Sequence, residues 1–311
     1  MFTRLSKPWS LLLAAALVLA ACAPATPAAT PTSAPLTFTD GLGRAVTLAA
    51  PAQRIVSLAP SNTEILFALG AGAQLVGRDE VSDYPEAAKA VTSIGSLYGP
   101  MNTEAIVALE PDLVLAAEIN SPEQVKALED LGLTVYWLAN PQDFEGLYEN
   151  LKIMGRLTGH AAEAEQLADS LKTRVTTVLD KLAGVTDRPK VFYELDATDP
   201  TKPYTVGPGT FMHTLLGLAG GENIAGGLPD AYPQISSEEL VRQNPTLILL
   251  GDGAYGVTAE AVQARPGWEA IAAVQTGNIV PFDDNLASRP GPRLVDGLEL
   301  LARLLHPDLF Q

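Results

Sequence analysis

The sequence predicts an α/β fold, made of two Rossmann-like lobes that are joined by one long helix. Short apolar runs alternate with helical segments, which is typical of parallel sheets covered by helices on both faces. Residues 161–183 contain neither glycine nor proline and carry apolar residues at helical spacing. TEAIVALEPDLVL at 103–115 is echoed by SEELVRQNPTLIL at 237–249. The echo indicates that both halves share one design.

The first half contains the elements of a complete lobe. RAVTLAA and RIVSLAP are strand-like, and TEILFALGAG is an apolar helix that stops at glycine. QLVGR, DLVLAA and TVYWL are further strands. The helix before TVYWL has Ser121 as its predicted cap and Pro122 at its first position. We assign residues 37–158 to this N-terminal lobe.

The second half begins after the long helix. Residues 159–184 are predicted to form the connecting backbone helix, and KVFYEL then restarts the alternation in a C-terminal lobe at 185–311. The glycine-rich segment before FMHTLL lacks the residues of a nucleotide-binding loop, so Thr210 is interpreted as a helix cap. Because a single helix is a stiff connection, we expect limited hinge motion between the lobes.

The N-terminal residues are typical of an exported lipoprotein. Arg4 and Lys7 precede a short apolar run that ends in LAAC, which resembles a bacterial lipobox. We expect a signal peptide at 1–21, lipidation of Cys22, and a disordered tether at 22–36. The chain would then be anchored at the outer face of the cytoplasmic membrane. The alternative is an incidental cysteine in an ordinary cleaved leader.

Composition narrows the function classes. The net charge is −16, with 36 acidic against 20 basic residues, which argues against nucleic-acid binding through a basic face. The sequence has neither a G-x-S-x-G elbow nor an H-E-x-x-H motif, so we assign no catalytic residues and no cofactor. The histidines lie far apart, so no metal site is predicted, and His213 is the only candidate for the cleft.

Glu64 follows Ser61 at the spacing of a capping box, at the start of an apolar helix. One interpretation is that Glu64 caps its own helix. The other is that it faces a partner. The residues alone favour the capping box.

The chain contains the segments APSNTE, SDYP, MNTEAIVALEPDLVL, GGENIA, YPQIS and SRPGPR. Together these segments resemble the class III substrate-binding proteins of ABC importers, and the cobalamin-binding members most of all. The likeness extends from about residue 37 to residue 311. It implies a ligand cleft between the lobes and an ABC permease dimer with its ATPases as partner. The implied ligand is cobalamin or a related corrinoid, with a ferric siderophore or haem as the alternative. An extracytoplasmic enzyme on this fold is less favoured.

The resemblance also implies roles for individual residues. Glu64 and Glu238 would dock into arginine pockets of the permease. Aromatic walls suit a flat macrocycle, so loop tyrosines are expected to contact it, although such residues also serve as half-exposed packing. Asp284 or Asn285 would bind a ligand amide, Arg289 could reach an anionic ligand, and Arg293 is interpreted as a structural partner. Ala117 departs from the family, which often has an aromatic residue there. The tyrosines are Tyr84, Tyr98, Tyr204 and Tyr232.

Overall fold

The computed structural model describes residues 1–2, 35–96 and 99–310. The chain divides into two units, Met1–Ala34 and Pro35–Gln311, of which the second is compact. The helices and strands described here belong to the second unit. Cys22 and Tyr98 lie outside the described residues, and so do nearly all of the predicted signal peptide and of the tether. Strand β1 begins at Leu36, the last residue of the predicted tether.

The N-terminal lobe is built on a four-stranded parallel sheet with the strand order β4-β3-β5-β6. All five residues of β5 are buried, because helices cover both faces of the sheet. Alternate residues point to two cores: Leu113 and Leu115 pack with α1 and α4, whereas Val114 and Ala116 pack with α2 and α3. The strands are β3 (Ile55–Ser57), β4 (Leu75–Arg78), β5 (Leu113–Ala117) and β6 (Val135–Leu138).

The helices of this lobe are α1 (Pro60–Ala68), α2 (Thr103–Ala108), α3 (Pro122–Asp130) and α4 (Phe144–Thr158). Two short 3-10 helices, Ala71–Gln74 and Glu86–Ala90, lie in the connections. An antiparallel hairpin of β1 (Leu36–Thr39) and β2 (Ala45–Leu48) packs against the core that contains α1 and α4. Ser121 forms a capping box with Gln124, and Pro122 occupies the first turn of α3, as predicted.

The C-terminal lobe repeats this plan with the parallel order β10-β9-β7-β8. Its sheet lies between α6 and α11 on one face and α7, α8 and α9 on the other. Thr210 caps α6, as predicted. The elements are β7 (Lys190–Glu194), α6 (Phe211–Leu218), β8 (Glu222–Asn223), α7 (Ser237–Gln243), β9 (Leu247–Leu250), α8 (Ala259–Gln263), α9 (Ala272–Thr276), β10 (Ile279–Pro281), α10 (Asn285–Ser288) and α11 (Leu294–Leu305), with 3-10 turns at Gly251–Tyr255 and Pro307–Leu309.

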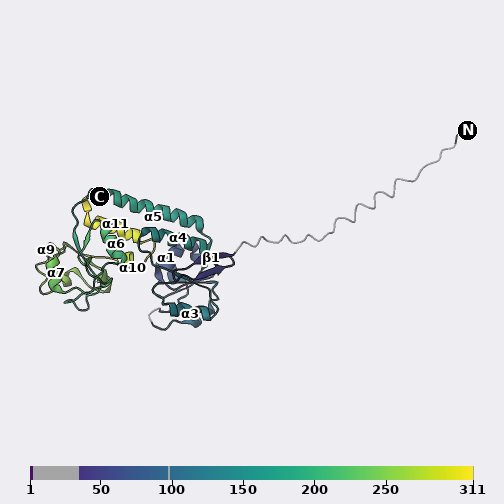
Figure 1. Ribbon diagram of the computed structural model, residues 1–311, viewed down its shortest axis with the longest axis horizontal. Helices are drawn as coiled ribbons and strands as arrows, with labels where there is room; N and C mark the ends of the chain where they lie inside the picture. The colour runs from purple at the N-terminus through teal and green to yellow at the C-terminus, as the bar shows by residue number, and fades with distance from the viewer. Residues whose placement is uncertain (3–34, 97–98, 311) are drawn as a thin grey trace. The chain divides into compact units, whose positions relative to one another are not determined.

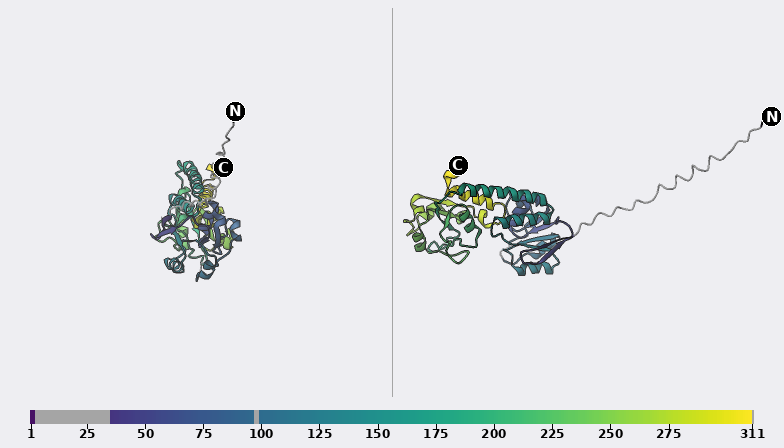
Figure 2. Two further views of the ribbon diagram at one scale, coloured as in Figure 1. Left: turned by 90° about the vertical axis from the view of Figure 1, so that its right-hand side faces the viewer. Right: turned by 45° about the horizontal axis from the view of Figure 1, so that its top comes forward.

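One long helix connects the lobes. Helix α5 (Ala161–Leu182) packs against α4 of the first lobe and α11 of the second (Figures 1 and 2). A single apolar core runs through all three helices, and Arg174 of α5 pairs with Asp296 and Glu299 of α11 at 2.6 and 2.9 Å. The predicted long helix is therefore confirmed, while the exact domain boundaries stay predictions. In the described ranges, no helix combines the length and apolarity that a membrane span requires.

Candidate functional site

A cleft lies where the carboxyl ends of strands from both sheets face one another. Two adjoining cavities, of about 260 and 390 Å³, make up this interlobe cleft. They share Asn140, which follows β6, and Asp284, which follows β10. Ligands of α/β proteins bind outside the carboxyl ends of parallel strands, so the position matches the expectation. Further lining comes from Ala59, Pro60, Ser61, Ala117, Glu118, Ile119, Leu195, Phe211, Tyr232, Tyr255, Asn285 and Arg289.

A third cavity of about 390 Å³ extends the cleft into the C-terminal lobe. We call it the side pocket. It shares Leu195 with one cavity of the cleft and Tyr255 with the other. Its remaining lining is Asp196, Ala197, Thr198, Asp252 and Val257.

Asp284 is held in place by a buried tyrosine. The Tyr193 hydroxyl donates a hydrogen bond to Oδ1 of Asp284, and burial together with this nearby carboxylate raises the pKa of Tyr193. Gly251 lies against the same ring, where an added Cβ would meet the hydroxyl at 2.3 Å. The Asp284 carboxylate is thus held in place in the ligand-free protein through Oδ1. The described residues show no hydrogen bond to its other oxygen, Oδ2.

The structure separates the predicted ligand tyrosines. Tyr232 lines the interlobe cleft with 61% of its surface exposed, beside Asp284. Tyr204 is half-exposed and forms backbone bridges with Asp196 and Gln234, but it lines none of the three cavities. Tyr232 therefore remains a candidate ligand contact, and Tyr204 is placed outside the cleft.

Tyr84 lies elsewhere. It lines a separate pocket beside α5, together with Phe67, Leu167 and Leu171, and the Arg293 guanidinium lies 4.0 Å from its ring centroid. This ring packs in a cation–π contact, and Tyr84 lines neither cavity of the interlobe cleft, so its contact with a ligand stays a prediction.

Tyr255 was missed by sequence reasoning. It lines both the interlobe cleft and the side pocket, and 90% of its surface is exposed. The signal was available, because GDGAYG directly follows the buried strand LILL and therefore stands at the carboxyl end of a parallel strand.

Glu64 is an internal ion-pair partner. Only 3% of its surface is exposed, and its carboxylate accepts two hydrogen bonds from Arg293, at 2.8 and 2.5 Å, and one from Arg289 at 3.3 Å. Arg289 also bonds Asp83 at 2.7 Å. We call these four residues the interlobe ion-pair cluster. Both expectations for Glu64 are wrong. It is too buried to dock, and α1 begins at Pro60 with Ala59 at its cap, so Ser61 forms no capping box with it.

The structural role of Arg293 is in agreement with the sequence interpretation. Arg289, in contrast, is engaged by carboxylates of the protein. The pairs link the N-terminal lobe to the segment before α11, close to where α5 passes.

Two exposed acids occupy equivalent places in the lobes. Glu238 is exposed at the second residue of α7, while Ser236 caps the helix and Glu239 pairs with Arg242. The repeat aligns Glu238 with Glu104, which is exposed at the second residue of α2 beneath the Asn102 cap. The internal repeat in the sequence gives this alignment, although Glu64 was predicted in place of Glu104 as the docking acid of the first lobe.

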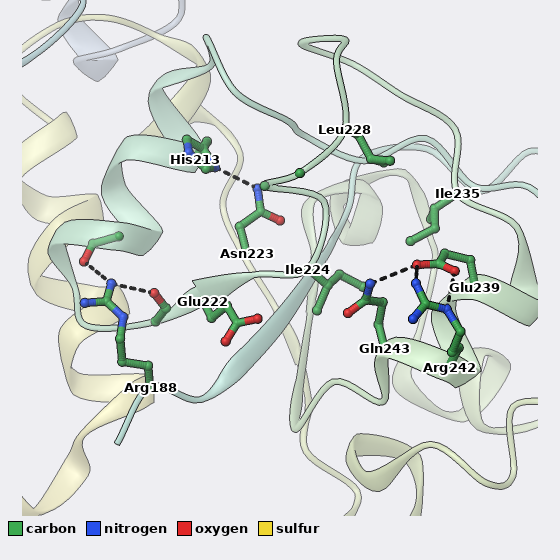
Figure 3. Close-up of a pocket in the computed structure, with 14 residues that line it drawn as sticks. Arg188, His213, Glu222, Asn223, Ile224, Leu228, Ile235, Glu239, Arg242 and Gln243 are labelled. Atoms are coloured by element: carbon green, nitrogen blue, oxygen red, sulfur yellow. Dashed lines mark hydrogen bonds and ion pairs between the residues drawn. The ribbon is translucent and has the colours of Figure 1, made fainter. Parts of the chain in front are cut away.

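A larger pocket of about 670 Å³ lies in the C-terminal lobe away from the cleft (Figure 3). His213 belongs here and not to the cleft. Asn223 donates to the Val206 carbonyl at 2.7 Å and to Nδ1 of His213 at 3.2 Å. Arg188 donates to backbone carbonyls, and Arg242 is paired with Glu239. In the described part of the chain, no three His, Cys, Asp or Glu residues are grouped to hold a metal.

Comparison with known proteins agrees with this geometry. Residues 55–286 match the model of the family described as periplasmic binding protein. A Bacillus subtilis protein named as an uncharacterized ABC transporter substrate-binding lipoprotein is 36% identical over 97% of this chain and 98% of its own. A cobalamin-binding protein of Halobacterium salinarum is 32% identical over 88% of this chain and 75% of its own.

Among solved structures, the periplasmic haem-binding protein RhuT of Roseiflexus sp. RS-1 has a TM-score of 0.74 at 27% identity, covering 83% of this chain and 99% of its own. Proteins that are named for different ligands therefore share this fold, and the ligand has to be argued from the lining of the cleft.

Proposed function

The chain belongs to the periplasmic binding protein family and acts as the extracytoplasmic substrate-binding protein of an ABC importer, and we propose that its ligand is cobalamin or a related corrinoid. The sequence relative named as cobalamin-binding supports this ligand. The solved relative named as haem-binding keeps haem as the second candidate.

The charge of the residues that line the cleft favours a corrinoid over haem. Arg289 is the single cation among the described residues that line the interlobe cleft and side pocket, and it already pairs with Glu64 and Asp83. Acidic groups are more numerous there: Glu118, Asp196, Asp252 and Asp284.

Haem and many siderophores present carboxylates, which such a lining repels. A corrin rim presents neutral carboxamides, whose N–H groups can donate to carboxylates. Tyr232 and Tyr255 add exposed side chains, one to each cavity of the cleft, which suits a broad, partly apolar macrocycle.

Delivery to the permease is proposed to use Glu104 and Glu238. They are exposed, occupy the same position in related helices, and carry the charge that arginine pockets recognise bidentately. Their equivalence is what a permease with two related halves requires.

Retention at the membrane is proposed to depend on lipidation of Cys22, which the relative named as a lipoprotein supports. The relatives named as substrate-binding and cobalamin-binding proteins also favour a binding role over a catalytic one.

The test is a calorimetric titration of the purified full-length protein, in detergent, with cyanocobalamin, haemin and a ferric hydroxamate in turn. We expect binding of cyanocobalamin with a dissociation constant in the micromolar range or below. Binding of haemin or the ferric chelate without heat from any corrinoid would reject the corrinoid assignment while leaving the family role intact.

A further inference from the structure

Asp252 stands at the wall of the side pocket with an unused acceptor. It follows β9 in the turn Gly251–Tyr255, and 5% of its surface is exposed. Oδ2 accepts a hydrogen bond from the backbone N–H of Ala197 at 3.2 Å. Oδ1 is buried and finds no hydrogen-bond partner among the residues that the structure describes.

A buried carboxylate oxygen without a hydrogen bond costs free energy, and burial of the group also disfavours its charged form. Burial and the nearby Glu194 carboxylate raise the pKa of Asp252 to about 6, although the Ala197 N–H and Arg265 oppose this shift. Arg265 is the nearby cation that could compensate, but both of its terminal nitrogens are bound to Glu194. The protein itself therefore leaves this oxygen without a donor.

The surroundings determine which donor fits. The side pocket joins the interlobe cleft through Leu195 and Tyr255, so a group at the edge of a ligand in the cleft has access to it. Asp196 and Asp252 line it together, and no cation does so among the described residues. A ligand carboxylate would meet two acidic groups, whereas an amide N–H would meet acceptors.

We propose that Asp252 is a specificity-determining residue that accepts a hydrogen bond from a carboxamide N–H on the rim of the ligand, and that it thereby favours amide-bearing ligands over their carboxylate counterparts. This inference rests on the proposed corrinoid function. Ligand binding supplies the hydrogen-bond donor that Oδ1 lacks. The free-energy cost of the unpaired oxygen in the free protein is therefore removed in the complex.

The experiment compares two ligands that differ at the rim: cyanocobalamin and its monocarboxylates, in which one side-chain amide is hydrolysed to a carboxylate. Each is titrated calorimetrically at pH 7.5 into wild-type protein, Asp252→Asn and Asp252→Ser. The control is Asp199→Asn, which removes an exposed carboxylate from the loop that carries Asp196 and Ala197; Asp199 itself lines none of the pockets described.

Wild-type protein is expected to bind cyanocobalamin more tightly than at least one monocarboxylate, by about tenfold or more, as for a hydrogen bond to a charged acceptor. Asp252→Asn should reduce this ratio by about tenfold, since its amide donates to a carboxylate. Asp199→Asn should keep the wild-type ratio. The ratio of the two dissociation constants does not depend on the fraction of folded protein, because both ligands bind the same folded state. A less stable variant therefore still gives a valid ratio.

If both Asp252 variants keep the wild-type ratio for every monocarboxylate, the inference is wrong and the corrinoid function stands. If wild-type protein binds no corrinoid at all, the proposed ligand and this inference fall together.

Discussion

Replacing Glu64 by glutamine removes the central charge of the interlobe ion-pair cluster. The side chains are almost fully buried, at 2% exposure for Glu64, 14% for Arg289 and 12% for Arg293. Burial alone would lower the pKa of Arg293, but hydrogen bonds and attraction from Glu64 outweigh it and raise this pKa. The variant leaves Arg293 with the Tyr84 ring at 4.0 Å and Asp283 at 3.9 Å.

Breaking a buried ion pair by removing one partner costs about 3–5 kcal/mol. We expect the lower end, about 3 kcal/mol, because Arg289 retains Asp83 at 2.7 Å and glutamine still offers one acceptor. The measurement is urea unfolding, followed by Trp137 in the N-terminal lobe and Trp268 in the C-terminal lobe through single-tryptophan variants.

Because the cluster joins the lobes, Glu64→Gln should also separate the two tryptophan transitions if they coincide in the wild type. The matched control is Glu104→Gln, an exposed acid of the same lobe, which should change stability by about 0.5 kcal/mol at most. A loss below about 1 kcal/mol for Glu64→Gln, with coincident transitions, would refute the role assigned to the cluster.

Three further expectations concern other residues. Glu104→Ala combined with Glu238→Ala should leave ligand binding unchanged and abolish uptake in cells, and normal uptake would contradict the docking assignment. Because the folded-state pKa of Asp252 is raised from 3.8 to about 6, the stability it contributes is present below pH 4 and lost as pH rises to about 6. Asp252→Asn should therefore raise the melting temperature relative to wild type more at pH 7.5 than at pH 4, and an equal difference at both pH values would argue against the raised pKa. Gly251→Ala places a Cβ 2.3 Å from the Tyr193 hydroxyl and should cost about 1–3 kcal/mol in thermal or urea unfolding, whereas wild-type stability would show that Tyr193 moves freely.

Local features of this fold could be predicted from the sequence because they depend on nearby residues. The long helix at Ala161–Leu182 follows from helical spacing without glycine or proline. Ser121 and Thr210 are caps because their side chains accept from backbone N–H groups three residues ahead. The two parallel sheets follow from apolar strands that alternate with helices.

Long-range pairing explains what the sequence did not reveal. Glu64 meets Arg289 and Arg293, which lie more than 200 residues later in the chain, and no local pattern specifies such a pair. Tyr84 was assigned to the cleft because the family resemblance places loop tyrosines against the ligand, whereas its ring packs against Arg293. Loop position alone does not determine which way a side chain faces.

The internal repeat held information that was used only in part. It relates α2 to α7 and so Glu104 to Glu238, and the structure shows both acids exposed at the same helix position. For Tyr255, the strand that precedes it gave the direction of the loop. Glu104 and Tyr255 both show that a residue's position in the predicted topology identifies candidate site residues better than its residue type does.

The most direct test of the central claim is a crystal structure of the protein grown with saturating cyanocobalamin. We predict the corrin between the two lobes, in contact with Tyr232, Tyr255 and Asp284, with a carboxamide directed at the side pocket. Ligand bound instead in the pocket around His213 and Arg188, or an unchanged empty cleft at saturation, would contradict the proposed function.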